Sequence, residues 1–230
     1  MQLSAENLED LPSSWFRYET KVPLQRQQYQ ELIPSFYGMG LHPKKTYPDR
    51  LVHSIYLDTP ELDDYFDNVS GVSRRRKIRL RWYGEDPSHM VIEVKSKKNK
   101  VSGKRIIHLE NPENLIPRDR HALKILFEGN IVSSPIDIAP LYRPVLQVAY
   151  RRSYFELKPG IRMTLDREIR YQKLSPSVSH QMRLSPVDYV VEFKYSVSQE
   201  REFKNLLRDF PFRIFRHSKY IVGMDVVAVG

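Results

Sequence analysis

The sequence predicts an α+β protein built on a closed antiparallel β-barrel, or tunnel, of about eight strands with helices packed on the outside. Apolar and polar residues alternate with a period of two along much of the chain, which is the strand signal. The 40% hydrophobic content is enough for a core. Charged tracts and prolines are dispersed, and no repeat or linker divides the chain. Residues 1–230 therefore form one domain, with 1–14 as a lead-in.

Eight segments carry the alternation. They are Trp15–Val22, Leu51–Leu57, Lys77–Tyr83, His89–Lys95, Lys104–Leu109, Pro144–Leu157, Gly160–Arg170 and Tyr189–Ser196. Eight strands in antiparallel order suit a closed barrel.

Other segments have helical periodicity or turn composition. The expected helices are Gln25–Tyr37, Arg118–Glu128 and Ser198–Phe210. Pro34 should bend or end the first helix, and Ser198 is a suitable N-cap for the third. The expected loops are Gly38–Pro48, Pro112–Pro117 and Ser175–Pro186.

Composition limits the function classes. The chain has no cysteine, which excludes disulfides, thiolate zinc sites and cysteine nucleophiles. No apolar run approaches the roughly 20 residues that cross a bilayer, and the first residues lack signal-peptide anatomy. These features predict a cytoplasmic protein without a membrane-spanning segment. The formal net charge of +9 predicts a polyanionic partner.

The polar faces of the predicted strands carry an unusual number of cations. Lys77, Arg79 and Arg81 share one face of a strand, with apolar residues between them. The same spacing places together Arg17, Glu19 and Lys21; Glu93 and Lys95; Tyr150 and Arg152; Arg162, Thr164 and Asp166; and Glu192 and Lys194.

Two interpretations of these faces are open. Each charged face could be the solvated outer side of a sheet. Three cations in a row repel one another, however, unless an anion neutralises them. Inside a barrel the lower effective dielectric strengthens the attraction for a polyanion, and arginine and lysine are the residues that bind phosphate oxygens. We therefore favour a tunnel that holds a nucleoside triphosphate or polyphosphate.

Sequence blocks along the chain resemble the catalytic domain of the vacuolar transporter chaperone (VTC) family. That domain is a polyphosphate polymerase within the CYTH-like, or triphosphate tunnel metalloenzyme, superfamily. The resemblance rests first on SIYLDTPELDDYFDN and KIRLRWYG. It runs from about Arg17 to Gly223, and further blocks follow in family order: RYETK, IEVKSK, AYRRSYF, RMTLDRE, VEFKY and HSKYIVG. Several dispersed blocks in one order are far more specific than any one of them.

The resemblance implies roles for individual positions. The residues that grip the triphosphate and growing chain are Lys21, Arg79, Arg81, Lys95, Tyr150, Arg152 and Lys219. The resemblance also implies phosphate-binding roles for Arg105, Arg216 and Ser218, and the strand alternation described above adds Lys77, Arg162 and Lys194. Glu192 matches the metal-binding carboxylate, helped by Glu19 or Glu93. The sequence does not fix whether Lys104 or Arg105 faces inward.

The expected activity is that of an ATP–polyphosphate phosphotransferase of the polyphosphate kinase type. It would move the γ-phosphoryl group of ATP onto a polyphosphate chain, with a divalent ion, Mn²⁺ first and Mg²⁺ second. Hydrolases of the superfamily carry two glutamates before the lysine of the first strand. Here the strand reads Arg17-Tyr18-Glu19-Thr20-Lys21, and Arg17 in place of the first glutamate disfavours two-metal hydrolysis.

Three other functions are weighed against this one. An inorganic triphosphatase would use the same fold, but Arg17 argues against it. A non-catalytic polyphosphate-binding module would keep the same tunnel. An RNA-binding β-domain would place aromatics among the cations. Most strand aromatics instead fall on the opposite faces, so we expect no nucleic-acid partner. No Walker loop, zinc spacing, dinucleotide glycine pattern, Ser-His-Asp set or SPX region is recognisable, and the sequence gives no oligomeric state.

Overall fold

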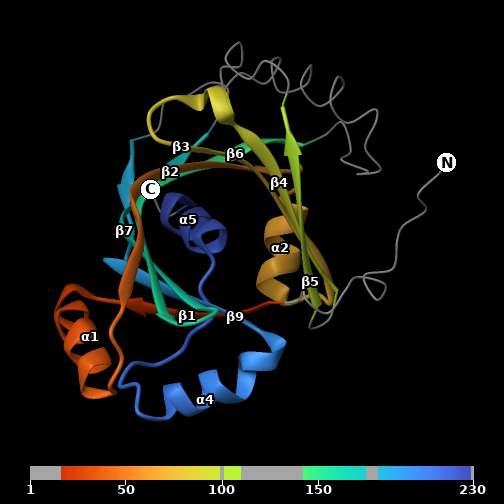
Figure 1. Ribbon diagram of the computed structural model, residues 1–230. Helices are drawn as coiled ribbons and strands as arrows, with labels where there is room; N and C mark the ends of the chain where they lie inside the picture. Colours follow the sequence, from red (N-terminus) through yellow and green to blue (C-terminus); the bar gives the residue numbers. More distant parts are fainter. Residues whose placement is uncertain (1–16, 99–100, 110–141, 175–180, 229–230) are drawn as a thin grey trace.

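Figure 1 shows the computed structural model of the protein, in which one antiparallel sheet curves around the C-terminal helix. The structure describes residues 17–98, 101–109, 142–174 and 181–228. The strands pair in the order β1-β9-β7-β6-β2-β3-β4-β5, and β8 joins β7 beside this path. Every pair is antiparallel.

The strands are β1 (Arg17–Leu24), β2 (Lys44–Asp58), β3 (Arg74–Tyr83), β4 (Val91–Lys98), β5 (Val101–His108), β6 (Arg143–Lys158), β7 (Ile161–Lys173), β8 (Arg183–Leu184) and β9 (Tyr189–Ser196). The helices are α1 (Arg26–Gly38), α2 (Asp63–Ser70), α4 (Glu200–Arg208) and α5 (Lys219–Ala228). Short 3₁₀ segments lie at Pro87–His89 and Val197–Gln199.

The prediction of a closed barrel is wrong, because the sheet is open. In the described part of the chain, β1 and β5 end the strand order and no backbone ladder joins them. The physical reason is what the sheet encloses. A helix with its side chains is about 10 Å wide, whereas side chains alone fill a closed eight-stranded barrel. A sheet of this size that wraps a helix has to stay open.

The enclosed helix is α5, which contacts β6 and β7 and appears inside the ring of strands in Figure 1. Tyr220 of α5 stacks on Tyr56 of β2, with ring centroids 4.8 Å apart. We call this side of the sheet the inner face and the opposite side the outer face. The expectation that the helices pack on the outside therefore fails for α5.

Gly223 allows α5 to lie directly on the sheet. A Cβ atom there would sit 2.5 Å from the Tyr171 ring and 2.6 Å from a Leu146 methyl group. Sequence reasoning missed this helix because KYIVGMDVVA is rich in β-branched residues and contains glycine, a composition typical of strands. Packing against the inner face outweighs that local preference.

Buried Asp58, at the end of β2, ties α2 and α5 to the sheet. Its carboxylate accepts hydrogen bonds from the backbone amides of Asp64 and Tyr65, at 3.0 and 2.9 Å, and from the Tyr220 hydroxyl. The first two bonds satisfy free N–H groups in the first turn of α2. This short helix was also absent from the sequence prediction.

Helices α1 and α4 pack on the outer face, as expected. Leu32 and Phe36 of α1 and Phe203 of α4 are buried with Phe193 of β9 in one apolar cluster. Pro34 does not end α1, which continues to Gly38. A second outer cluster covers β3 and β4, where the residues between the cations are buried: Ile78, Leu80, Trp82, Ile92 and Val94.

Other predicted boundaries differ at the strand ends. β9 has the predicted bounds, but β2 begins at Lys44, inside the segment Gly38–Pro48 that was expected to be a loop. The strand β8 lies in the last part of another expected loop. The predicted helix Arg118–Glu128 and loop Pro112–Pro117 lie outside the described residues.

Candidate functional site

Arginines of β3 surround Glu93 of β4 on the inner face. Arg79 Nη2 lies 2.6 Å from Glu93 Oε2, and Arg79 Nη1 donates a 3.1 Å hydrogen bond to the Tyr56 hydroxyl. Arg81 Nη1 lies 3.2 Å from Glu93 Oε2, and Lys104 of β5 lies 2.5 Å from Oε1. Burial alone would raise the pKa of Glu93, but the three cations together hold it well below its usual range.

A second group joins β6, β7 and the start of α5. Arg152 binds both oxygens of fully buried Asp166, at 2.6 and 2.8 Å, and Lys219 Nζ lies 2.5 Å from Oδ2. Lys219 also lies 4.7 Å from the Tyr150 ring centroid, and Arg81 donates to the Tyr150 hydroxyl at 3.3 Å. Burial would raise the pKa of Tyr150, yet the neighbouring cations lower it. The Tyr150 hydroxyl is thus surrounded by positively charged side chains.

The carboxylates Glu192 of β9 and Glu19 of β1 form the third group. Glu192 Oε2 lies 3.4 Å from Lys21 Nζ, and Oε1 lies 2.9 Å from Lys194 Nζ. Glu19 Oε2 lies 2.6 Å from Lys95 Nζ. Burial and Glu192 would raise the pKa of Glu19, but Lys95, Lys21 and Lys194 lower it overall. Burial would also raise the pKa of Glu192, but Lys21, Lys194 and other nearby cations hold it well below its usual range. Glu19 and Glu192 are therefore both carboxylates at neutral pH.

Lys77 of β3 differs from the other inner-face cations. Within the described residues no carboxylate lies in ion-pair range of its ammonium group, which donates to the Ser218 hydroxyl at 2.9 Å. Burial, followed by the charges of Lys21 and Lys95 and of nearby arginines, lowers the pKa of Lys77 to about 7. A bound anion would offset the repulsion from the neighbouring cations and favour the charged form of Lys77.

Most predicted site residues come together on the inner face. They are Lys21, Lys77, Arg79, Arg81, Lys95, Tyr150, Arg152, Glu192, Lys194, Glu19, Glu93, Ser218 and Lys219. Arg162 is exposed at the inner-face end of β7, beside Lys194 in the register. Arg216 is exposed just before α5, where its charge helps to lower the pKa of Lys97.

Arg105 does not join this group. It pairs in the register with Val94, so its side chain belongs to the outer face of β5, whereas Lys104 pairs with Lys95 and reaches Glu93. The register between β4 and β5 decides which of the two basic residues faces inward, and no local pattern reveals it.

Sequence reasoning assigned no role to Asp166, and it left open whether Lys104 or its neighbour Arg105 faces inward. Asp166 was recognised only as a neighbour on one strand face. The available signal was its position: it is an acidic residue on the same strand face as Arg162, in a chain whose strand faces are rich in cations. A buried carboxylate there requires cationic partners, and the structure supplies Arg152 and Lys219.

Cations outnumber carboxylates on the inner face. The cations are Lys21, Lys77, Arg79, Arg81, Lys95, Lys104, Arg152, Lys194 and Lys219, and the carboxylates are Glu19, Glu93, Asp166 and Glu192. An excess of positive charge gathered on one face, and partly buried there, favours an anion that carries several charges.

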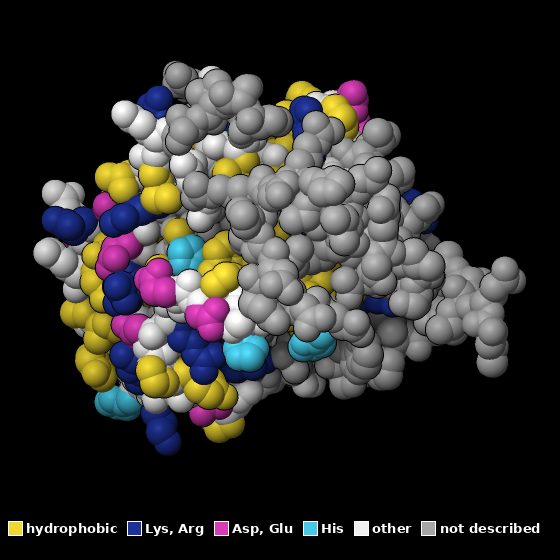
Figure 2. Space-filling view, turned by 90° about the horizontal axis from the view of Figure 1, so that it is seen from above, with side chains coloured by type: hydrophobic (Ala, Val, Ile, Leu, Met, Phe, Trp, Pro, Cys, Tyr) yellow, Lys and Arg dark blue, Asp and Glu magenta, His cyan; other side chains and the backbone are white. Residues whose placement is uncertain are grey.

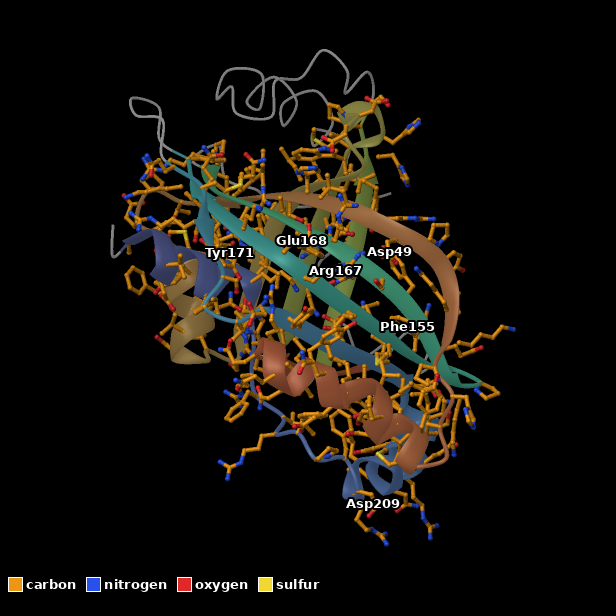
Figure 3. The ribbon with its side chains drawn as sticks, turned by 90° about the vertical axis from the view of Figure 1, so that its left-hand side faces the viewer. Asp49, Phe155, Arg167, Glu168, Tyr171 and Asp209 are labelled. Atoms are coloured by element: carbon orange, nitrogen blue, oxygen red, sulfur yellow. The ribbon has the colours of Figure 1, made fainter. Side chains whose placement is uncertain are left out.

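The outer face has a different charge pattern. Arg167 of β7 lies 2.8 Å from Asp49 of β2, and Arg151 lies 3.4 Å from Glu168 (Figure 3). The described part of the face in Figure 2 mixes basic, acidic and hydrophobic side chains. These outer-face arginines are paired with carboxylates, whereas the inner face carries more cations than carboxylates.

The donors beside Glu192 fit a hard divalent cation. The Thr164 hydroxyl, register partner of Glu192, is buried and has no hydrogen-bond partner in the described part of the chain. With Glu19 it offers oxygen ligands of the kind that Mg²⁺ and Mn²⁺ prefer. The described residues contain no cluster of three or more acidic or histidine ligands. Such an ion would therefore take its remaining ligands from phosphate oxygens of the substrate. Glu93, engaged by three cations, does not join this set.

Comparison with known protein families identifies the family of the chain. A sequence model of the VTC domain matches residues 16–228, so the chain belongs to the VTC domain family. The family recognised from the sequence blocks is thereby confirmed. None of the curated proteins compared with the chain matches it.

Among solved structures, the chain is similar to a putative adenylate cyclase from Vibrio parahaemolyticus, with 13% identity, a TM-score of 0.51, and coverage of 91% of this chain and 98% of that one. It is also similar to a putative adenylate cyclase from Bacillus halodurans, with 14% identity, a TM-score of 0.52, and coverage of 88% and 94%. At such identity the likeness shows a shared fold alone.

In the described ranges, the chain has no helix with the length and apolar character needed to cross a bilayer.

Proposed function

We propose that this VTC domain is a metal-dependent polyphosphate polymerase, which transfers the γ-phosphoryl group of ATP to the end of a polyphosphate chain. The observation that carries the proposal is the inner face, where unbalanced cations surround the carboxylates Glu19 and Glu192. A polyanion is the substrate class for such a surface, and carboxylates among cations provide for a divalent ion.

The reaction needs little covalent chemistry from the protein. A terminal phosphate oxygen of the acceptor chain attacks the γ-phosphorus, the bond to the β,γ-bridging oxygen breaks, and ADP leaves with that oxygen. The attacking oxygen is already anionic, so no general base is required. Catalysis then depends on positioning and on stabilisation of the charge spread over the transferring group.

The inner-face residues divide this work. Arg79 and Arg81 are held by Glu93 with their guanidinium groups side by side, which leaves N–H donors for phosphate oxygens. Lys219 and Arg152 are fixed in the same way by Asp166. The Tyr150 hydroxyl donates to a phosphate oxygen between the two pairs. Because the carboxylates orient these cations before substrate arrives, little reorganisation is needed in the transition state.

Glu192, with Glu19 and Thr164, would hold the divalent ion, Mn²⁺ or Mg²⁺. When bound, the ion supplies a Lewis acid that neutralises charge on phosphate oxygens. Lys21 and Lys194 now neutralise Glu192 and would shift toward phosphate once the ion takes their place.

The test is incubation of the purified protein with ATP and Mn²⁺, followed by separate measurement of ADP, free phosphate and polymer on a stained gel. We expect ADP and polyphosphate with little early phosphate. Glu192→Gln should abolish synthesis yet preserve triphosphate binding, because it removes the metal's anionic ligand and one charge that repels the substrate. Phosphate released in step with ADP, without polymer, identifies a hydrolase. Absence of both products, with triphosphate still bound, identifies a binding module.

A further inference from the structure

A cluster of aromatic rings surrounds Arg50 at the end of the inner face away from α5. The guanidinium carbon lies 5.7 Å from the ring centroid of Tyr47, 5.8 Å from that of Tyr83 and 5.8 Å from that of Tyr154. Tyr47 and Tyr154 also meet edge to face, with centroids 5.8 Å apart. We call these four residues the Arg50 cluster. They come from three neighbouring strands, β2, β3 and β6.

The Arg50 cluster shares the inner face with the phosphate-binding residues. Arg50 pairs in the register with Arg152. Tyr83 is two residues from Arg81 on β3, and Tyr154 is two residues from Arg152 on β6. Because a strand rises about 3.3 Å per residue, each of these pairs is separated by about 7 Å along its strand. The cluster therefore begins one side chain beyond the residues assigned to the triphosphate.

The cluster is open to solvent. Tyr47 is 57% exposed and Tyr83 is 45% exposed, and Arg50 is exposed between them. In the described residues Arg50 has no carboxylate within ion-pair range, in contrast to the inner-face arginines Arg79, Arg81 and Arg152. Its planar group is held by ring faces rather than by a carboxylate. Exposed ring faces grouped around a flat cation form a stacking platform.

We propose that the Arg50 cluster binds the nucleobase of the nucleoside triphosphate. This inference rests on the proposed function and extends it to the non-phosphate end of the substrate. A base has a flat π-face that stacks on tyrosine rings and on an arginine guanidinium, and it needs no hydrogen-bond readout to do so. With the γ-phosphate among Arg79, Arg81 and Lys219, the base of the same molecule extends along β2 and β3 toward Tyr83.

The position of the Arg50 cluster also distinguishes the phosphoryl donor, a nucleotide, from the phosphoryl acceptor, polyphosphate. Inorganic polyphosphate has no aromatic group and gains no stacking energy from the rings of the Arg50 cluster. A nucleotide gains stacking at this end, so the donor is oriented with its γ-phosphate toward the centre of the inner face.

The experiment compares two ligands by calorimetry, in EDTA so that neither reacts: ATP and inorganic triphosphate. We expect Tyr83→Ala to weaken ATP binding by about tenfold, the factor that about 1.4 kcal/mol of base stacking supplies, and to leave triphosphate binding unchanged. Arg50→Lys keeps the charge but loses the planar group, so it should act in the same direction. The matched control is Tyr37→Ala, since Tyr37 is 55% exposed at the end of α1, outside the site.

Each outcome decides the matter. Selective loss of ATP affinity supports the nucleobase site. Equal weakening of both ligands, or no change in either, shows that the cluster only braces the three strands and overturns it. If the wild type forms polymer while the variants do not discriminate between the ligands, the nucleobase site fails and the polymerase stands. If the wild type binds triphosphate but forms no polymer, the proposed activity fails, while the selectivity of the variants still reports on the base.

Discussion

Lys95 of β4 and Glu19 of β1 form an ion pair, 2.6 Å long, between strands from opposite ends of the sheet. The backbone leaves the sheet open between β1 and β5, and this contact bridges the two sides through side chains alone. Glu19 also interacts with Glu192, because the negative charge of each carboxylate disfavours ionisation of the other. The Lys95–Glu19 ion pair therefore bridges the open side of the sheet and also sets the charge beside Glu192.

Glu19→Gln should strengthen the binding of inorganic triphosphate in metal-free buffer. The substitution removes a negative charge from the inner face and releases Lys95 for the ligand. Folding stability should change by less than about 1 kcal/mol, because the pair is partly exposed to solvent. Calorimetry and urea denaturation measure the two effects, with Glu31→Gln on α1 as control. Weaker triphosphate binding in Glu19→Gln would show that Lys95 needs Glu19 to hold its position.

Lys104→Ala and Arg105→Ala should separate the two faces of β5. Lys104 reaches Glu93 among the inner-face arginines, and Arg105 belongs to the outer face. Lys104→Ala removes one of the three cations that neutralise Glu93 and lowers the positive charge of the inner face, so it should weaken triphosphate binding, by up to about tenfold if Lys104 also contacts the ligand. Arg105→Ala removes the same formal charge from the neighbouring position and should have little effect at moderate salt. Equal losses in both variants would mean that total charge, rather than the inner face, governs affinity.

Lys77 should make anion binding depend on pH near neutrality. The pKa of Lys77 is lowered to about 7, so the side chain is charged below pH 7 and loses its charge as the pH rises through 7. Its contribution to triphosphate affinity is therefore present at pH 6 and largely lost at pH 8. Lys77→Arg keeps its positive charge over this range. Because the ligand itself titrates in the same way with both proteins, its contribution cancels in the ratio of the two affinities.

We expect the ratio of wild-type to Lys77→Arg affinity to fall between pH 6 and pH 8, by about tenfold for one charge-assisted contact. Calorimetry in two buffers with different ionisation enthalpies should also detect more proton uptake on binding at pH 8 in the wild type than in Lys77→Arg. A constant ratio and no proton uptake would place Lys77 away from the anion.

Gly223→Ala should destabilise the fold by about 1–3 kcal/mol, because overpacking forces neighbouring side chains from their positions. The new methyl group would meet Tyr171 and Leu146, which are buried under α5. Gly38→Ala is the control: a Cβ atom at the end of α1 meets nothing within 4 Å. Urea denaturation measures both. Unchanged stability in Gly223→Ala would indicate that α5 can move off the inner face at little cost.

Strand periodicity predicted much of the site. The alternation in KIRLRWY placed Lys77, Arg79 and Arg81 on one face and buried Ile78 and Leu80 on the other, as the structure has them. A one-residue shift in a strand reverses every side chain, so a buried apolar face fixes the opposite face as well. The family could also be recognised, because its blocks occur in order along one chain.

Contacts between distant segments could not be predicted in this way. The pairing of Lys104 with Lys95, the grip of Lys219 on Asp166 and the meeting of Tyr83, Arg50 and Tyr154 all depend on register or on the path of the chain. The Lys219 and Arg50 contacts join residues far apart in sequence, and the Lys95–Lys104 pairing depends on the register of two adjacent strands, so no local pattern contains that information.

The sequence by itself determined the strands, the polarity of their faces and the excess of cations on one of them, because each follows from the period-two geometry of a strand. Only the tertiary structure decided that the sheet stays open and that α5 lies within it. The segment of α5 has a strand-like composition, and its helical form is stabilised by apolar contacts that exist only once the sheet has curved around it. That enclosed helix brings Ser218 to Lys77 and Lys219 to Asp166, and so completes the site.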